Sequence, residues 1–358
     1  MSKLNQYNFL KKTLFTVILS LSLAVFPASA KAKNSKKAPD WITGQSKAYP
    51  KAEYLTASGV ADSKRAAELD AINELAAVFG QKITSATLAS KRLTMAQSQG
   101  LVASSSESSL AQDILREVSQ DDIIAVEIPE FYEAKSEGKW YALAVINKSK
   151  ASQIYSGMIE KNQKEVEAII MQIQKDKEAD TMLNFSRLDF AEEVAKKNET
   201  YLKRLTVLAP KEAEKFSAIN TPVQIHKMKI DMAARIPVCV NVDDDSDGRI
   251  TKSFQEVMTS FGFNTTIGSN ERYIISCKNH FTESASSNAK TKFCEYAAEC
   301  ALIDTFLGET LIPLSITGRE GSTTYQNAEV RAKQKIVTKI KSEFAAGFQK
   351  YLGDFSAF

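Results

Sequence analysis

The sequence predicts an α+β protein in which two small α+β domains, each a helix packed on an antiparallel or mixed sheet, are joined by a long helical hairpin. Residues 39–147 alternate strand-like runs with one helix rich in small residues. Residues 148–208 are highly charged and carry apolar residues at helical spacing, with no Gly or Pro between Met158 and Ala209. Residues 221–358 return to short strands and helices, and this segment holds all four cysteines.

The first thirty residues have the pattern of a cleaved signal peptide. Lys3, Lys11 and Lys12 form a basic region, an apolar run follows from Leu14 to Phe26, and Ala28-Ser29-Ala30 is a small-x-small cleavage site. The apolar run is shorter than the roughly 20 residues that cross a bilayer. We therefore expect export and a mature chain that begins at Lys31. A retained helical anchor is the alternative.

The charge balance argues against nucleic acid as a partner. The three lysines of residues 1–30 account for the whole formal surplus of +3, so the mature chain is close to neutral, whereas phosphate binding needs a cationic surplus. The basic leader of residues 31–38 is predicted to be a solvated tail, and contact with anionic lipid headgroups is its alternative.

In residues 39–147, a short strand from Tyr54 to Val60 precedes a helix marked by Ala67, Ala71 and Leu75. The small residues predict that this helix lies close against a sheet. Residues 93–109 are predicted to be irregular or an edge hairpin, and residues 110–118 a short helix. Two strands, 123–132 and 139–146, follow with a turn at 136–138.

Two apolar stripes predict the hairpin of residues 148–208, with a break near residues 179–184. Such stripes usually pack within the chain, and a coiled coil that binds a partner is the alternative.

The end of the chain resembles its beginning. Residues 55–59 and the helix after them correspond to residues 314–318 and a helix marked by Ala328, Ala332 and Ile336. Both segments are predicted to be a strand, a glycine, a loop and a helix with small residues four apart.

The cysteines Cys239, Cys277, Cys294 and Cys300 suggest two disulfides, because an even set in an exported chain usually pairs. Among the three pairings we favour Cys239 with Cys277 and Cys294 with Cys300. A zinc site is the alternative, but there is no CxxC pair, and His280 is the only histidine nearby.

The segment from Asp243 to Ile250 matches the first eight positions of a calcium loop, with Asp243, Asp245 and Asp247 at positions 1, 3 and 5. Position 12, where a bidentate Glu is needed, is Phe254. The favoured interpretation is an acidic turn between a strand and a helix, with Asp247 as the cap. A weak structural calcium site remains the alternative, and no other cofactor is predicted.

Four aromatic residues of the first domain, Trp41, Tyr49, Tyr54 and Trp140, have two possible roles. Packing in the core is the favoured one. The alternative is an exposed patch that docks a partner or a glycan.

Several short motifs of the first domain resemble the twenty-kilodalton outer-membrane lipoprotein family. They are Pro39-Asp40-Trp41, Tyr49-Pro50, Tyr54-Leu55 with Gly59, and the strand Trp140 to Val145 before a helix at Lys148. The resemblance covers about residues 38–155 and implies a small α+β envelope module without catalysis, found in outer-membrane-associated proteins and in accessory proteins of flagellar rings. The third region more distantly resembles flagellar assembly protein T and related envelope assembly factors.

One departure from that family concerns its lipid anchor. The first cysteine of the chain is Cys239, so the cleavage region lacks the cysteine that lipidation needs. We therefore expect a periplasmic protein that is not lipidated and that touches the outer membrane only peripherally.

The predicted function is non-catalytic, because no G-x-S-x-G, HExxH, P-loop or GxGxxG motif is present. We expect a structural or assembly component that binds other envelope proteins and itself, in a flagellar or other envelope ring. The alternative is a monomeric binding or chaperone-like module that depends on calcium.

Overall fold

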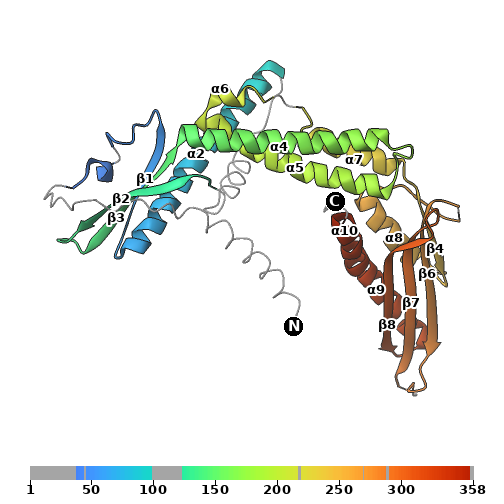
Figure 1. Ribbon diagram of the computed structural model, residues 1–358. Coiled ribbons are helices and arrows are strands. Elements are labelled where there is room, and N and C mark those ends of the chain that lie inside the picture. The colour runs from blue at the N-terminus through green and yellow to red at the C-terminus, as the bar shows by residue number, and fades with distance from the viewer. Residues whose placement is uncertain are drawn as a thin grey trace.

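The computed structural model describes residues 38–43, 46–98, 123–216, 219–268, 270–287 and 290–354. The predicted signal peptide, most of the basic leader and the predicted helix at 110–118 lie outside these residues. The molecule is elongated: the first α+β module lies at one end of a long helical pair and the C-terminal domain at the other (Figure 1). The predicted α+β class is confirmed, with one antiparallel and one mixed sheet.

The first module is a helix packed on a three-stranded antiparallel sheet. The sheet has the order β1-β3-β2, so β3 is central and β1 and β2 are edges. Its elements are η2 (Asp40–Thr43), β1 (Tyr54–Ala61), α2 (Lys64–Ser98), β2 (Val126–Ala134) and β3 (Lys139–Asn147).

The helix α2 extends further than the sequence predicts. Residues 93–98, expected to be irregular or an edge hairpin, continue the helix. Residues 99–122 are outside the described part of the chain.

Gly59 of β1 lets α2 approach the sheet closely. A Cβ atom on Gly59 would lie 2.0 Å from the backbone nitrogen of Ala71 and 2.6 Å from the carbonyl oxygen of Ala67. Ala67, Ala71 and Leu75 are fully buried on this face of the helix. The spacing of small residues in the sequence therefore marks a contact between helix backbone and strand backbone.

The helical hairpin consists of α4 (Lys148–Lys175) and α5 (Met182–Leu208). The side chain of Asn147 caps α4 by accepting from the Lys150 N–H, and that of Thr181 caps α5 by accepting from the Asn184 N–H. At the approximate 1.5 Å rise per helical residue, α4 is about 42 Å long.

Each end of the hairpin belongs to a different core. Tyr155 and Ile159 of α4, with Leu205 and Leu208 of α5, pack in the core of the first module. At the far end, Val166 and Ile173 of α4 and Met182, Phe185 and Leu188 of α5 pack in the core of the C-terminal domain. The hairpin is therefore a shared structural part of both domains.

The C-terminal domain has a five-stranded sheet of order β5-β4-β6-β7-β8. The strand β4 runs parallel to β5 and β6, whereas β6, β7 and β8 form an antiparallel meander. The elements after the hairpin are α6 (Pro210–Ala213), α7 (Pro222–Ala234), β4 (Val238–Asp243), α8 (Arg249–Ser260), β5 (Thr265–Thr266), β6 (Tyr273–Glu283), β7 (Lys292–Asp304), β8 (Glu309–Ser322), α9 (Tyr325–Lys339), the π-helical η4 (Ile340–Phe344) and α10 (Ala345–Asp354).

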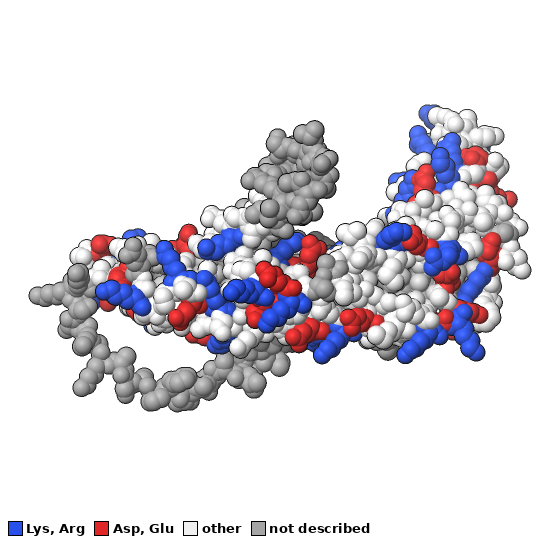
Figure 2. All heavy atoms as spheres, turned by 90° about the horizontal axis from the view of Figure 1, so that it is seen from above, with Lys and Arg blue, Asp and Glu red and all other residues white. Residues whose placement is uncertain are grey.

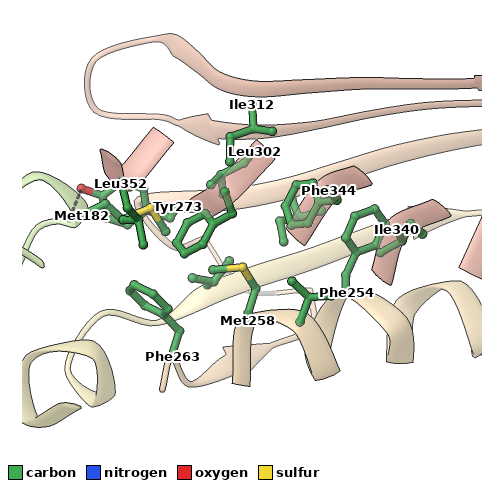
Figure 3. Close-up of a cluster of buried hydrophobic side chains, with 14 of the residues drawn as sticks. Met182, Phe254, Met258, Phe263, Tyr273, Leu302, Ile312, Ile340, Phe344 and Leu352 are labelled. Atoms are coloured by element: carbon green, nitrogen blue, oxygen red, sulfur yellow. Dashed lines mark hydrogen bonds between the residues drawn. The ribbon is translucent and has the colours of Figure 1, made fainter. Parts of the chain in front are cut away.

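The core of this domain lies between its helices and the sheet. Phe254 of α8 points toward Phe344 of η4 and Met258 of α8 points toward Tyr273, with Leu302 and Ile312 of the sheet above them (Figure 3). The Phe254 and Phe344 rings meet edge to face, with centroids 5.0 Å apart. Aromatic pairs favour this geometry, which specifies how η4 sits on α8.

The two glycines of the apparent repeat have different tasks. Gly59 makes room for the backbone of α2, whereas a Cβ atom on Gly318 would lie 2.4 Å from the Tyr296 hydroxyl oxygen. Gly318 therefore leaves room for an aromatic ring of the neighbouring strand. The two strand–helix units share a pattern of residues but not the contact that their glycines serve.

Candidate functional site

Three of the four predicted interaction aromatics lie together on the sheet face opposite α2. Trp41, only 2% exposed, packs with Leu143 and Val145, and Tyr49 and Tyr54 border this cluster. The Tyr49 and Tyr54 rings meet edge to face with centroids 5.2 Å apart.

The indole Nε1 of Trp41 donates a 2.7 Å hydrogen bond to Glu130 Oε2. Trp140 is separate from the cluster, since it packs with the core on the α2 side of the sheet. The structure thus brings together only Trp41, Tyr49 and Tyr54.

A pocket of about 310 Å³ opens beside this cluster, along β1. Trp41 and Leu143 form one wall, and Val78 and Lys82 of α2 form the other. Its remaining lining residues are Ser46, Lys51, Tyr54, Leu55, Thr56, Ala57, Ser58 and Lys148.

Three lysines from distant parts of the sequence line this pocket: Lys51, Lys82 and Lys148. The ammonium of Lys148 donates to the carbonyl oxygens of Lys51 at 2.7 Å and Ala52 at 3.4 Å, which holds it in place. Burial and the nearby charge of Lys82 lower the pKa of Lys148. Within the described ranges, none of the three ammonium groups forms an ion pair with a carboxylate. The pocket is therefore positively charged and suited to an anionic group.

The sequence does not reveal these lysines as a group, because they are far apart along the chain. Residues 51, 82 and 148 lie in a turn, on α2 and at the start of α4, and only the fold brings them to one place. Lysine in a charged chain usually marks a solvated surface. The available signal was weak: Lys51 and Lys148 each adjoin the family-like motifs.

The acidic turn at residues 243–248 serves the start of α8. Asp245 accepts from the backbone N–H of Ile250 at 3.2 Å and Thr251 at 2.7 Å, and from the Thr251 hydroxyl at 2.8 Å. Asp245 therefore satisfies the free N–H groups of the helix, a task that the sequence analysis gave to Asp247. Asp247 contributes less: it accepts from the backbone N–H of Arg249 at 3.3 Å, and its carboxylate lies 3.2 Å from Arg249 Nε.

The structure does not group the acidic side chains as calcium ligands. Asp243 contributes its backbone carbonyl to Asn279 Nδ2, at 2.7 Å. In the part of the chain that the structure describes, no three His, Cys, Asp or Glu side chains lie close enough to hold a metal ion.

The predicted disulfide pairing is wrong. Cys277 is bonded to Cys300, its direct partner across β6 and β7, and Cys239 and Cys294 are free and buried. Cys239 lies opposite Ile274, which is three residues from Cys277. Because side chains alternate along a strand and three is an odd number, Cys239 and Cys277 point to opposite faces of the sheet. Cys294 and Cys300 share one extended strand and are separated by roughly 20 Å, beyond the reach of a disulfide.

A buried ionic cluster joins α5 to α7. Lys229 lies 2.5 Å from Glu192 and 2.8 Å from Asp189, and Lys196 lies 3.0 Å from Glu192. Burial alone would raise the pKa of Glu192, but hydrogen bonds from Lys229, Lys196 and His226 outweigh it and lower this pKa to about 2. Glu192 is therefore an anion at neutral pH.

A second ionic cluster fixes the tip of the hairpin to the C-terminal domain. The Arg272 guanidinium donates hydrogen bonds to both oxygens of the buried Asp304 carboxylate, at 2.8 to 3.1 Å. It also donates to Glu178 of the hairpin turn at 2.9 Å. Nearby, the N–H of Met182 donates to the Tyr273 hydroxyl at 3.1 Å. These contacts set the angle between the hairpin and the β6–β7 sheet.

The first module matches the model of a known protein family. Residues 39–147 match the model of the LPP20 lipoprotein family, which confirms the resemblance predicted for residues 38–155. The match covers the three-stranded sheet with α2 and ends where α4 begins. A similarity of the C-terminal region to flagellar assembly protein T is not found, and no curated protein matches the chain.

Solved structures give weak likenesses. The secreted protein HP1454 of Helicobacter pylori is 15% identical, with a TM-score of 0.42, and the alignment covers 84% of this chain and 98% of that one. A minor lipoprotein of Acinetobacter baumannii is 14% identical, with a TM-score of 0.22 and coverage of 34% and 91%. The rare lipoprotein B of Shewanella oneidensis is 14% identical, with a TM-score of 0.22 and coverage of 33% and 94%.

The predicted localisation is corrected by the family match. The sequence predicts a periplasmic protein that is not lipidated, because no cysteine directly follows Ala30. The family matched across the first module is one of lipoproteins, which points to a lipidated outer-membrane lipoprotein. None of the helices in the described residues combines the length and apolar character that crossing a membrane requires.

Proposed function

We propose that this chain is a non-catalytic structural or assembly component of the cell envelope, which binds other envelope proteins and holds its two α+β ends a fixed distance apart. The family match points to a non-enzymatic envelope lipoprotein. The binding of partners and the assembly role are the finer part of the proposal.

The observation that carries the proposal is the hairpin shared by both cores. Because α4 starts directly after β3 and ends inside the C-terminal core, the described residues 148–208 join the two ends by a packed helical pair. Domains joined by a linker usually move relative to one another. A chain whose spacer is packed into both domains presents two surfaces at a set separation, as a component of an assembly needs.

The surface charge supports protein partners. Along the elongated body seen in Figure 2, basic and acidic side chains are interspersed. Such mixed surfaces favour specific contacts with other proteins over the sequence-independent attraction that nucleic acid exerts on basic fields.

The test is the native size of the protein in the envelope. The protein is extracted gently from purified envelopes and compared with the recombinant mature chain by native electrophoresis and sedimentation. We expect the envelope form to be several times larger than the recombinant monomer and to yield specific neighbours after chemical crosslinking. A monomer of the same size in both preparations would contradict the assembly role.

A ligand-binding module is the second candidate, and the lysine-lined pocket favours it. In that case the envelope form would be a monomer, and a ligand would raise its melting temperature in proportion to the logarithm of the ligand concentration.

A further inference from the structure

The strand β1 has a free edge. Its pairing with β3 is continuous, from Tyr54 opposite Asn147 to Ala61 opposite Trp140, and among the described residues no strand pairs with the other side of β1. The N–H of Val60 points to that other side, since it donates to Asp70 Oδ2 at 2.8 Å. Alternate residues of an antiparallel strand point their backbone groups the same way, so those of Thr56 and Ser58 also face outward.

These outward groups line the pocket described above, which contains residues 54–58 of β1. In the described residues, Asp70 supplies the one side-chain acceptor for this edge, at Val60. The N–H of Tyr54 already donates to the Pro50 carbonyl at 2.9 Å. The edge from Tyr54 to Ser58 therefore offers a short row made of the N–H groups of Thr56 and Ser58 and the outward carbonyl groups, inside a pocket. Such a row is a template for an added strand.

The charges of the pocket select the occupant. Lys51, Lys82 and Lys148 surround the Tyr54 end of the edge without a carboxylate partner in the described part of the chain. Carboxylates on the occupant would neutralise them, and Trp41 and Leu143 offer an apolar wall to a neighbouring side chain.

We propose that an extended acidic segment of another envelope protein pairs with the free edge of β1, with its carboxylates held by Lys51, Lys82 and Lys148. This inference rests on the proposed function and assigns one of its binding surfaces. Because Asp70 occupies the edge at Val60, the added strand spans about four or five residues.

The test uses the full mature chain and two blocked hexapeptides of alternating Val-Glu and Val-Lys, titrated at low ionic strength. We expect the acidic peptide to bind and the basic peptide not to bind. At saturation, hydrogen exchange of the Thr56 and Ser58 amides should slow at least about tenfold, because those N–H groups enter a ladder.

Two substitutions separate the charge from the strand pairing. Lys82→Glu should weaken the acidic peptide at least about tenfold, which corresponds to about 1.4 kcal/mol. Its matched control is Lys150→Glu, the same charge change on an exposed residue outside the pocket, with an expected effect under about twofold.

Ser58→Pro removes an outward N–H that β3 does not use, and an edge strand tolerates this change. It should abolish the exchange protection at Thr56, whereas Ser58→Ala should preserve it. The melting temperatures of all variants are measured first. If Ser58→Pro does not fold, the comparison of Lys82→Glu with Lys150→Glu decides the proposal.

Equal binding by Lys82→Glu and Lys150→Glu, or unchanged exchange at Thr56 and Ser58, would overturn the proposal. If inorganic phosphate displaces the acidic peptide and Ser58→Pro has no effect on peptide binding, the site is a simple anion pocket. If the Thr56 and Ser58 amides become protected in the unliganded protein as its concentration rises, the occupant is a second copy of this chain. If any of these results is found together with a large envelope complex, the proposed assembly role is retained and only the proposal that β1 binds an acidic segment is rejected.

Discussion

Gly59 is the residue on which the packing of the first module most depends. Any side chain there would collide with the backbone of α2, which cannot move aside as a flexible side chain can.

Gly59→Ala should therefore destabilise the protein by about 3 kcal/mol, the upper part of the range for overpacking. Chemical denaturation monitored by circular dichroism measures the loss. Gly157→Ala is the matched control, because a Cβ atom on Gly157 meets nothing within 4 Å and alanine favours the helix α4. A loss of stability smaller at Gly59 than at Gly157 would refute this account of the contact.

The cysteines give a second prediction at this scale. With Cys277 and Cys300 bonded, the denatured, unreduced protein should expose two thiols per chain to a thiol reagent, and the reduced protein four. In the native state both free thiols should react slowly, since Cys239 and Cys294 are buried and burial raises the pKa of Cys294. The double substitution Cys239→Ser with Cys294→Ser should leave the disulfide intact. A denatured protein without free thiols would contradict this pairing.

Among the elements, α5 and α7 are held together by the cluster around Glu192. The lowered pKa of Glu192 means that its stabilisation is fully present above its ordinary pKa of 4.5 and is lost as the pH falls toward about 2. The contribution is on the order of 2 kcal/mol after allowance for the coupling of the groups.

Glu192→Gln should accordingly flatten the decline of stability between pH 4.5 and about 2 and lower the stability at pH 7. The control is Glu193→Gln, because Glu193 contacts the same Lys196 but is exposed. Denaturation curves measured across this pH range make the comparison, and identical slopes for the two variants would argue against the cluster as their source.

The elements that sequence predicts well are those with a strong period. The hairpin is visible in buried residues seven apart, Ile159, Val166 and Ile173, uninterrupted by Gly or Pro. The strand β7 also has a clear alternation, with Cys294, Tyr296 and Ala298 buried, yet it was missed. Its Ala, Glu and Lys residues are depleted in strands generally, and tertiary pairing with two neighbours overrides that preference.

The short helix α7 was missed although it carries a start signal. Thr221 and Gln224 form a capping box, and Pro222 occupies the first turn. By contrast, neither the disulfide nor the lysine-lined pocket could be read from the chain. Cys277 meets Cys300 through strand register. The lysines converge because α2 packs against β1 and because α4 begins directly after β3, the neighbour of β1. Both are long-range consequences of the fold.

For the molecule as a whole, the length of the hairpin is the quantity that the assembly role depends on. Removal of one heptad from each helix, residues 160–166 and 194–200, keeps the seven-residue seam and shortens the rod by about 10 Å. The shortened protein should fold, and its maximum dimension in X-ray scattering should fall by about that amount.

The same deletion should abolish the large envelope complex, because the two ends would no longer reach their sites together. A useful control is the single substitution Met171→Ala, at an exposed position on α4, which leaves the length of the hairpin unchanged. A shortened protein that still assembles would show that the distance between the two ends is irrelevant.

The hairpin also determines how the molecule responds to mechanical load. The chain travels out along α4, returns along α5 to the first module, and then leaves again toward α7 and the C-terminal sheet (Figure 1). A pull on the two ends would act along the axes of helices that lie side by side. It would load their contacts in shear, so that many of them must yield at once, and forced separation would follow the unfolding rate of the whole rod. The hairpin that sets the distance between the two ends would therefore also let the protein resist tension applied between them.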